Sequence, residues 1–122
     1  MAEARKRVLV VDDERAILTV LRVKLGISGY DVSTASSGEE ALALINSMHP
    51  DIMLLDVIMP GMDGFEVLEK VRAVSELPVI VISARPENRQ RALNLRANDF
   101  LAKPLDVDEL VGRIEVLLGK KN

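Results

Sequence analysis

Residues 8–13 of the chain read VLVVDD, a short apolar run that ends in two acids. Residues 52–56 repeat the pattern as IMLLD. A run of this kind is typical of a buried parallel strand whose last side chains reach the carboxyl edge of a sheet. If the two strands lie side by side, we expect Asp12, Asp13 and Asp56 to come together at that edge.

Three neighbouring carboxylates require a cation. At a separation of ~4 Å and a surface-like dielectric, each pair of like charges repels by about 4 kcal/mol. Ligands that are all oxygen suit magnesium. We therefore predict a Mg²⁺ pocket formed by Asp12, Asp13 and Asp56, in which one carboxylate is free to react.

The composition restricts the class of protein. We expect one domain over residues 1–122, with an ordered core from about 5 to 119. Only 2% of the residues are aromatic against 48% hydrophobic, so the core must be aliphatic. The absence of cysteine excludes disulfides and thiol catalysis, and a net charge of −3 argues against direct nucleic-acid binding. No apolar run approaches the roughly 20 residues of a membrane span, so we expect a soluble, cytoplasmic protein.

Strand-like and helix-like patterns alternate along the whole chain. We predict strands at 8–11, 31–35, 52–55, 79–82 and 100–101, each followed by a helical pattern, with the fourth helix starting near Pro86. Short β–α connections favour a doubly wound α/β domain with a parallel sheet. In such sheets, functional groups gather beyond the carboxyl ends of the strands.

Chemically capable side chains fall at these strand ends. Besides the three aspartates, Ser83 follows the fourth strand and Lys103 follows the fifth. Taken singly, an aspartate pair could be a solvated turn, Ser83 a helix cap and Lys103 an ordinary exposed lysine. Their joint occurrence at successive strand ends favours a common site.

Four motifs carry a resemblance to a known family. They are VDDE at 11–14, LLDVIMPGMDG at 54–64, ISA at 82–84 and ANDFLAKP at 97–104. In this order and spacing the chain resembles, over essentially its whole length, the CheY-like receiver domain of two-component response regulators. The resemblance implies a flavodoxin-like (βα)5 fold with strand order 2-1-3-4-5 and a cis Lys103–Pro104 bond.

The resemblance also implies a phosphoacceptor role for Asp56. Mg²⁺ would be held by Asp13, Asp56 and the backbone carbonyl of Ile58, with Asp12 acting through water, and Lys103 would supply a second cation. The phosphoryl donor would be a sensor histidine kinase, a histidine phosphotransfer protein or a small acyl phosphate. Such a domain catalyses only its own phosphorylation and dephosphorylation and is not otherwise an enzyme.

A conformational switch is implied as well. The hydroxyl of Ser83 would donate to a phosphoryl oxygen, and Phe100 would move into the vacated space. The surface around the fourth helix, fifth strand and fifth helix would change. An aromatic ring in an edge strand is also consistent with ordinary core packing.

Four charged residues suggest a dimer surface of the kind found in receivers of winged-helix (OmpR-like) transcription factors. Arg89 would face Glu109 of a second chain, and Asp99 would pair with its Arg113. The same charges could simply form a solvated face, where ion pairs contribute only ~0–1 kcal/mol each. We expect either a stand-alone regulator or a receiver excised from a longer protein.

Two features depart from the family pattern. Only 11 residues separate Ser83-Ala84 from Arg96-Ala97, about two fewer than usual, and Arg96 replaces a glycine that a positive φ would favour. Both could alter the fourth helix and the output surface. We expect Ile58 and Arg85 to flank the phosphoryl group, and Ile58 to limit the access of hydrolytic water.

Three other functions each fit part of the sequence. A degenerate receiver would bind partners without phosphorylation, but the acceptor set is intact. A phosphatase that forms an aspartyl phosphate requires a second acid two residues after the nucleophile, where Ile58 stands. A flavin carrier requires a first loop rich in Ser, Thr and Gly, whereas residues 12–14 are acidic and would repel phosphate.

Overall fold

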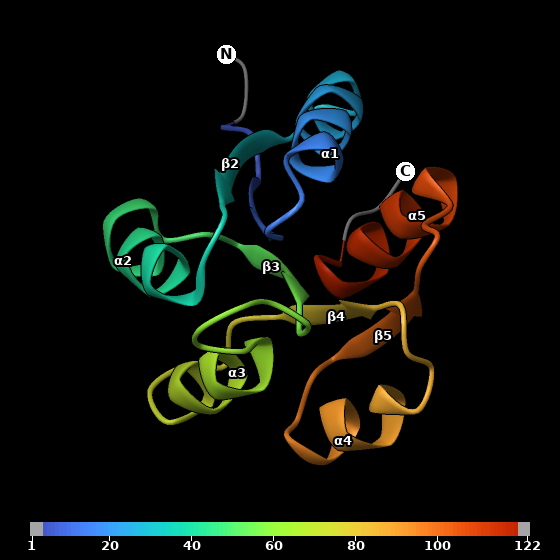
Figure 1. Ribbon diagram of the computed structural model, residues 1–122. Helices are drawn as coiled ribbons and strands as arrows, with labels where there is room; N and C mark the ends of the chain where they lie inside the picture. Colours follow the sequence, from blue (N-terminus) through green and yellow to red (C-terminus); the bar gives the residue numbers. More distant parts are fainter. Residues whose placement is uncertain (1–3, 120–122) are drawn as a thin grey trace.

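The fold alternates strands and helices from end to end. A computed structural model describes residues 4–119 (Figure 1). The elements are β1 Arg7–Val11, α1 Arg15–Ile27, β2 Asp31–Ala35, α2 Gly38–Met48, β3 Ile52–Asp56, α3 Gly64–Arg72, β4 Val79–Ser83, α4 Asn88–Asn94, β5 Asp99–Ala102 and α5 Val107–Leu117. Across these described residues, none of the helices has the length and apolar character needed to cross a membrane.

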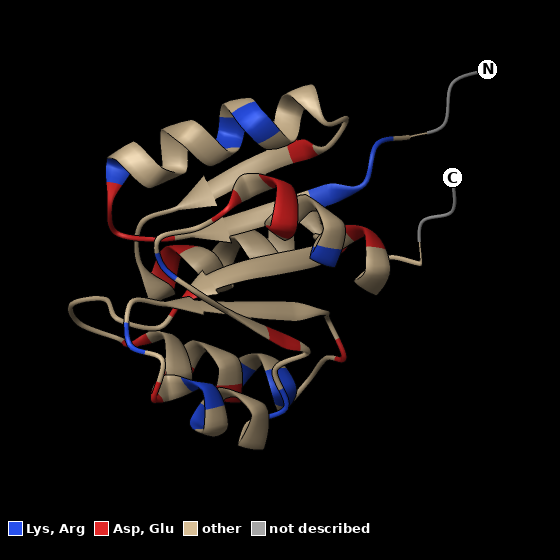
Figure 2. Cartoon of the chain, turned by 90° about the vertical axis from the view of Figure 1, so that its right-hand side faces the viewer, with Lys and Arg blue, Asp and Glu red and all other residues tan. Residues whose placement is uncertain are grey.

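The strands form one parallel sheet in the order β2-β1-β3-β4-β5, so the predicted doubly wound fold is confirmed. Val11 at the end of β1 is in register with Leu55 of β3. The residues after β1 therefore lie beside the end of β3. Figure 2 shows the acidic segment that follows β1 at the end of the sheet toward which the strands point.

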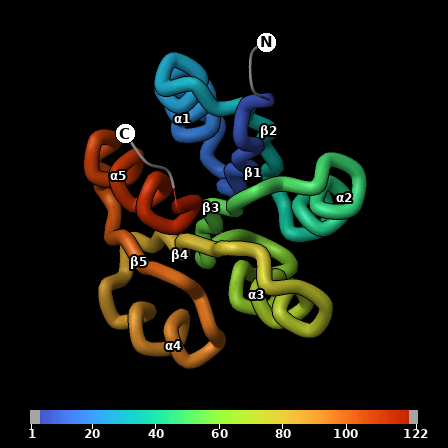
Figure 3. The backbone as a smooth tube through the Cα atoms, turned by 180° about the vertical axis from the view of Figure 1, so that it is seen from behind, coloured from blue at the N-terminus to red at the C-terminus, as the bar shows by residue number. Residues whose placement is uncertain are grey.

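Two aliphatic layers enclose the sheet. Helices α1 and α5 cover one face, and α2, α3 and α4 cover the other (Figures 1 and 3). Alternate residues of β1 serve the two layers, with Leu9 and Val11 on the α2–α4 side and Val8 and Val10 on the α1–α5 side. Every residue of β3 and β4 is buried. Each buried aliphatic side chain contributes about 1.5–3 kcal/mol, so this sheet supplies a rigid platform.

Side-chain caps determine where three of the helices begin. Ser37 Oγ accepts a hydrogen bond from the backbone N–H of Glu40 at 3.1 Å, as its spacing predicts. The Glu40 carboxylate in turn accepts a hydrogen bond from the N–H of Ser36 at 2.7 Å, one residue earlier than in a standard capping box. Asp63 and Asp106 cap α3 and α5 in the same way as Ser37 caps α2.

Helix α4 begins at Asn88, two residues later than the sequence predicted. The N–H of Asn88 donates to the carbonyl of Arg85 at 3.0 Å, and that of Arg89 donates to the carbonyl of Pro86 at 3.1 Å. These short-range bonds form a turn, so Pro86 belongs to the turn and not to the helix. The connection from β4 to α4 is consequently only residues 84–87.

Arg96 adopts the positive φ that its place in the family pattern suggested, with φ at 69°. Arg72 of α3 holds this backbone, because its Nε donates to the Arg96 carbonyl at 3.0 Å and its Nη2 donates to Asn98 Oδ1 at 2.8 Å. Arg96 Nη2 in turn donates to the Arg72 carbonyl at 3.4 Å. The unfavourable conformation is thus fixed by hydrogen bonds from a neighbouring helix, and α4 keeps its place over the sheet.

Candidate functional site

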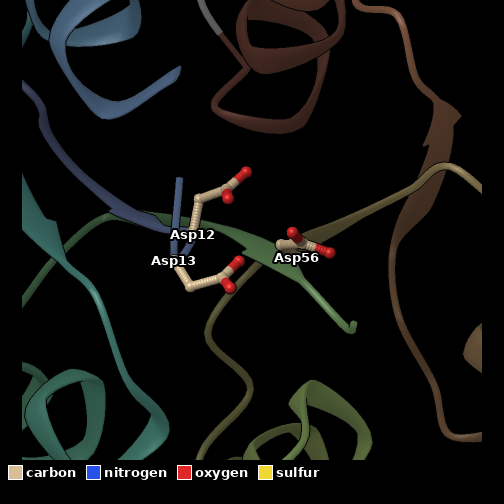
Figure 4. Close-up of side chains that lie close together, drawn as sticks. All are labelled: Asp12, Asp13 and Asp56. Carbon is tan, nitrogen blue, oxygen red and sulfur yellow. The ribbon is translucent and has the colours of Figure 1, made fainter. Parts of the chain in front are cut away.

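The predicted acidic cluster is present. Asp12 and Asp13 follow β1 and Asp56 ends β3, and one carboxylate oxygen from each lies within 4.8 Å of the others. Figure 4 shows the side chains of Asp12 and Asp13 pointing to the side where Asp56 lies. Asp12 and Asp56 are each only 3% exposed, whereas Asp13 is exposed. The sheet therefore holds two of the three acids largely away from water.

Backbone hydrogen bonds orient the two buried carboxylates. Asp12 Oδ1 accepts from the N–H of Glu14 at 2.9 Å, and Asp56 Oδ1 accepts from the N–H of Ile58 at 2.9 Å. In each aspartate the Oδ2 atom faces Lys103 instead. In both cases the backbone that follows the strand fixes the orientation of the aspartate side chain at the end of that strand.

Lys103 joins the cluster from the end of β5. Its Nζ lies 3.0 Å from Asp12 Oδ2, 3.1 Å from Asp56 Oδ2 and 3.1 Å from Glu14 Oε1. Burial lowers the pKa of Lys103, but hydrogen bonds to the three carboxylates outweigh burial and raise the pKa above its usual value. Lys103 is therefore a fixed cation. The bond to Pro104 is cis, as the resemblance implied.

Glu14 is a member of the site that the sequence analysis did not assign. Its side chain is 60% exposed, yet it holds Lys103. The sequence signal for Glu14 was its position directly after Asp12 and Asp13, because both Glu14 and Lys103 follow the carboxyl ends of predicted strands.

The positive charge around the buried Asp56 carboxylate is too small to offset its burial and the charge of Asp12. Burial raises the pKa of Asp56 and the charge of Asp12 raises it further, while the Ile58 N–H and Lys103 act in the opposite direction. A divalent ion would relieve this imbalance. Oxygens on opposite sides of Mg²⁺ lie about 4 Å apart. Three carboxylate oxygens that all lie within 4.8 Å of one another are compatible with that separation. The donor set therefore fits Mg²⁺.

Gly64 is a second contributor, which the sequence analysis named only as the last residue of the motif at 54–64. A Cβ atom at Gly64 would overlap the backbone of Asp56 and Val57. The N–H of Gly64 also donates to the Val57 carbonyl at 3.2 Å. The missing side chain lets α3 begin directly against the backbone of Asp56, which holds the segment after β3 in place.

The side chains of the predicted switch residues are not hydrogen-bonded to the acids of this cluster, although the end of β4 lies between β3 and β5 in the sheet. Ser83 is fully buried at the end of β4, and its Oγ accepts from the N–H of Arg85 at 3.0 Å and from Asn88 Nδ2 at 3.1 Å. Phe100 is 5% exposed and packs in the core on the α2–α4 side. This burial is compatible with a switch and with plain core packing, so the role of Phe100 stays a prediction.

The predicted dimer charges pair within one chain. Arg113 Nη1 lies 2.6 Å from Asp99 Oδ2, and Arg113 Nη2 lies 3.3 Å from Glu109 Oε2. The sequence prediction placed the Asp99–Arg113 pair across two chains. In the single chain, Asp99 at the start of β5 and Arg113 on α5 meet directly, so a dimer would have to exchange an existing pair. Arg89 on α4 is exposed.

Comparisons with known proteins agree with this arrangement. The sequence profile of the response regulator receiver domain matches residues 8–115. A probable transcriptional regulator, ycf27 of Guillardia theta, is 40% identical over 122 residues, which cover 98% of this chain and 48% of the relative. The chain thus spans about half the length of the curated relatives it matches.

Two solved structures are similar over nearly the whole chain. The Francisella response regulator 1452 receiver domain has a TM-score of 0.89 at 35% identity, covering 97% of this chain and 100% of that one. The response regulator TrrA of Thermotoga maritima, solved in complex with Mg²⁺ and BeF, has a TM-score of 0.86 at 35% identity, covering 92% and 98%. The resemblance inferred from the four motifs is confirmed.

The raised pKa of Asp56 leads to a prediction about stability. A carboxyl whose pKa is raised by folding contributes stability at low pH, and this contribution is lost as the pH rises through the folded-state pKa. The Asp56→Asn variant should therefore have a free energy of unfolding at pH 7 that is higher by about 1 kcal/mol. Its advantage should shrink as the pH falls and the parent Asp56 becomes protonated. Urea denaturation between pH 4 and 8 measures both effects.

The matched control is Asp31→Asn, which removes an exposed carboxylate at the start of β2. It should leave the free energy of unfolding nearly unchanged across this pH range. An Asp56→Asn variant less stable than the parent at pH 7, or a difference independent of pH, would contradict the electrostatic account of the site.

Proposed function

The chain belongs to the response regulator receiver domains, and we propose that it is a phosphoacceptor switch in which Asp56 takes up a phosphoryl group. The observation that carries the proposal is the position of Asp56. It is buried at the carboxyl edge of the sheet, and Lys103 Nζ, which also contacts Asp12, lies 3.1 Å from its Oδ2 atom. This combination provides a nucleophile and a fixed cation in one place.

The chemistry follows from charge neutralisation. A carboxylate oxygen of Asp56 attacks the phosphorus, and the bond from phosphorus to the donor atom breaks, with its electron pair leaving on the donor. Bound Mg²⁺ would be held by Asp13, Asp56 and the Ile58 carbonyl, with Asp12 acting through water, and would supply positive charge beside the phosphoryl oxygens. Lys103 supplies a further positive charge from the side of β5.

The donor is proposed to be a sensor histidine kinase or a histidine phosphotransfer protein, with small acyl phosphates as substitutes. Membership of the receiver family supports this partner and a cytoplasmic setting. The relatives that are named transcriptional regulators are about twice as long as this chain. Control of transcription is therefore proposed for a whole regulator, with this domain as its phosphorylated part. No separate substrate is turned over.

The proposed output lies on α4, β5 and α5. The Ser83 hydroxyl moves toward the phosphoryl group on Asp56, and Phe100 follows into the space that is vacated. The phosphoryl group contributes three strong acceptor oxygens and about −1.5 to −2 charge, which gives the two conformations different free energies. A dimer formed through this surface would exchange the Asp99–Arg113 pair between chains.

Acetyl phosphate tests the acceptor directly. With millimolar Mg²⁺, intact-mass measurement should find one added phosphoryl group on the parent and none on the Asp56→Asn variant. Omission of Mg²⁺ should prevent the reaction, because the carboxylate cluster then repels the anionic donor. The Asp31→Asn variant, altered far from the site, should react like the parent.

If the parent remains unmodified although it is folded, the domain acts by binding partners without phosphorylation. If the Asp56→Asn variant is modified equally, another residue is the acceptor. Either result would reject the proposed function.

Ile58 should determine how long the phosphorylated state lasts. Its side chain is 40% exposed while its N–H is bonded to Asp56 Oδ1, so an apolar group stands at the edge of the acceptor. An amide there could orient a water molecule toward phosphorus. Replacement of Ile58 by Asn should speed dephosphorylation at least threefold, which corresponds to about 0.7 kcal/mol of barrier.

The decay is timed by intact mass after removal of acetyl phosphate. An Ile27→Asn variant, altered at an 80% exposed apolar residue at the end of α1, is the matched control and should decay like the parent. Unchanged or slower decay of the Ile58→Asn variant would refute the role assigned to Ile58.

A further inference from the structure

The hydroxyl of Ser83 is held on the side of α4. Ser83 is 0% exposed, and its Oγ accepts from the backbone N–H of Arg85 at 3.0 Å and from the side-chain amide of Asn88 at 3.1 Å. Arg85 lies in the connection from β4 to α4, and Asn88 is the first residue of α4. The side-chain bonds of Asp56 are instead to Ile58 and Lys103. If the hydroxyl shifts toward a phosphoryl group on Asp56, as the proposed function requires, these two bonds are the ones that the shift affects.

The two donors to Ser83 differ in what they connect. Arg85 is two residues from Ser83 in the chain, so its N–H can follow the serine when the serine moves. Asn88 is the first residue of α4, and its own N–H is fixed to the carbonyl of Arg85 at 3.0 Å. A hydroxyl oxygen has two lone pairs, and these two donors use both. The Asn88 amide is the contact that Ser83 must break or draw with it.

In the part of the chain that the structure describes, few other side-chain hydrogen bonds connect α4 to the rest of the domain. It is seven residues long, and the residue before it, Glu87, makes no side-chain cap. Within the described residues, Asn88 supplies the side-chain hydrogen bond that α4 makes to the sheet, and Arg91 lies 4.0 Å from the ring centre of Phe65 on α3. The short connection of residues 84–87 keeps Asn88 close to Ser83.

We propose that Asn88 is a positioning residue that holds the Ser83 hydroxyl in its resting place and links its movement to the first turn of α4. This inference rests on the proposed function, because it concerns the same phosphorylated site. While the amide donates to Ser83, it stabilises the resting arrangement. When Ser83 turns to the phosphoryl group, the amide of Asn88 loses its acceptor and the first turn of α4 is released.

A merely structural role for Asn88 makes a different prediction. If the amide only stabilises α4, its removal should lower stability and leave the affinity for a phosphoryl mimic unchanged or weaker. If it holds the resting state, its removal should strengthen that affinity, because a contact present in only one state has been lost. Alanine is also the better helix former, so the Asn88→Ala variant should fold.

The experiment measures binding of beryllofluoride, a phosphoryl mimic, to the parent and to Asn88→Ala in the presence of Mg²⁺. One lost neutral hydrogen bond predicts half-saturation at a concentration about two- to tenfold lower in the variant. Affinity for Mg²⁺ alone should not change, because Asn88 does not touch the carboxylates. The matched control, Asn94→Ala, removes a 2.9 Å amide bond between Gln90 and Asn94 on the same helix and should bind like the parent.

A double-mutant cycle completes the test. In a Ser83→Ala background the substitution of Asn88 should have no effect, because the acceptor of its amide is absent. An Asn88→Ala variant with equal or weaker beryllofluoride affinity overturns the proposal, as does a gain that persists without the Ser83 hydroxyl. If the parent itself fails to bind Mg²⁺ and beryllofluoride, the proposed function has failed as well, and the two failures are thereby distinguished.

Discussion

The structure depends on keeping negative charges close together at one edge of the sheet. Asp12 and Asp56 are almost inaccessible to water, and Asp13 stands beside them. Lys103 offsets part of the repulsion from a distant point in the sequence, with its ammonium shared among three carboxylates. Repulsion between these charges lowers the stability of the fold. Burial of the aliphatic layers on both faces of the sheet offsets that loss.

Neighbouring features of the molecule keep this site in position. Gly64 lets α3 begin against the backbone of Asp56, while hydrogen bonds from Glu14 and Ile58 fix the buried carboxylates. At the end of β4, the Ser83 hydroxyl is hydrogen-bonded to the first residue of α4 and not to the acids. The site therefore combines a rigid part, which can hold a metal ion and a phosphoryl group, with Ser83 and α4, which can respond to the phosphoryl group.

Much of this arrangement could be predicted from the sequence, because it depends on the pattern of apolar residues and on the positions at which the strands end. Apolar runs that end in acids predicted the parallel sheet, and the positions of Asp12, Asp13 and Asp56 followed from the edge that such strands share. What could not be predicted depends on side-chain geometry between elements. The bond from Asn88 to Ser83, the contact of Glu14 with Lys103 and the pairing of Arg113 with Asp99 inside one chain have no periodic signal. The start of α4 differed because Pro86 closes a turn before the helix.

The central claim is that a divalent ion binds between the carboxylates. Crystals soaked in Mn²⁺, which favours the same oxygen ligands as Mg²⁺, would locate the ion by its anomalous scattering. The account predicts one strong peak about 2.0–2.2 Å from carboxylate oxygens of Asp13 and Asp56. A peak elsewhere, or none at this cluster with Lys103 still bridging Asp12 and Asp56, would contradict it.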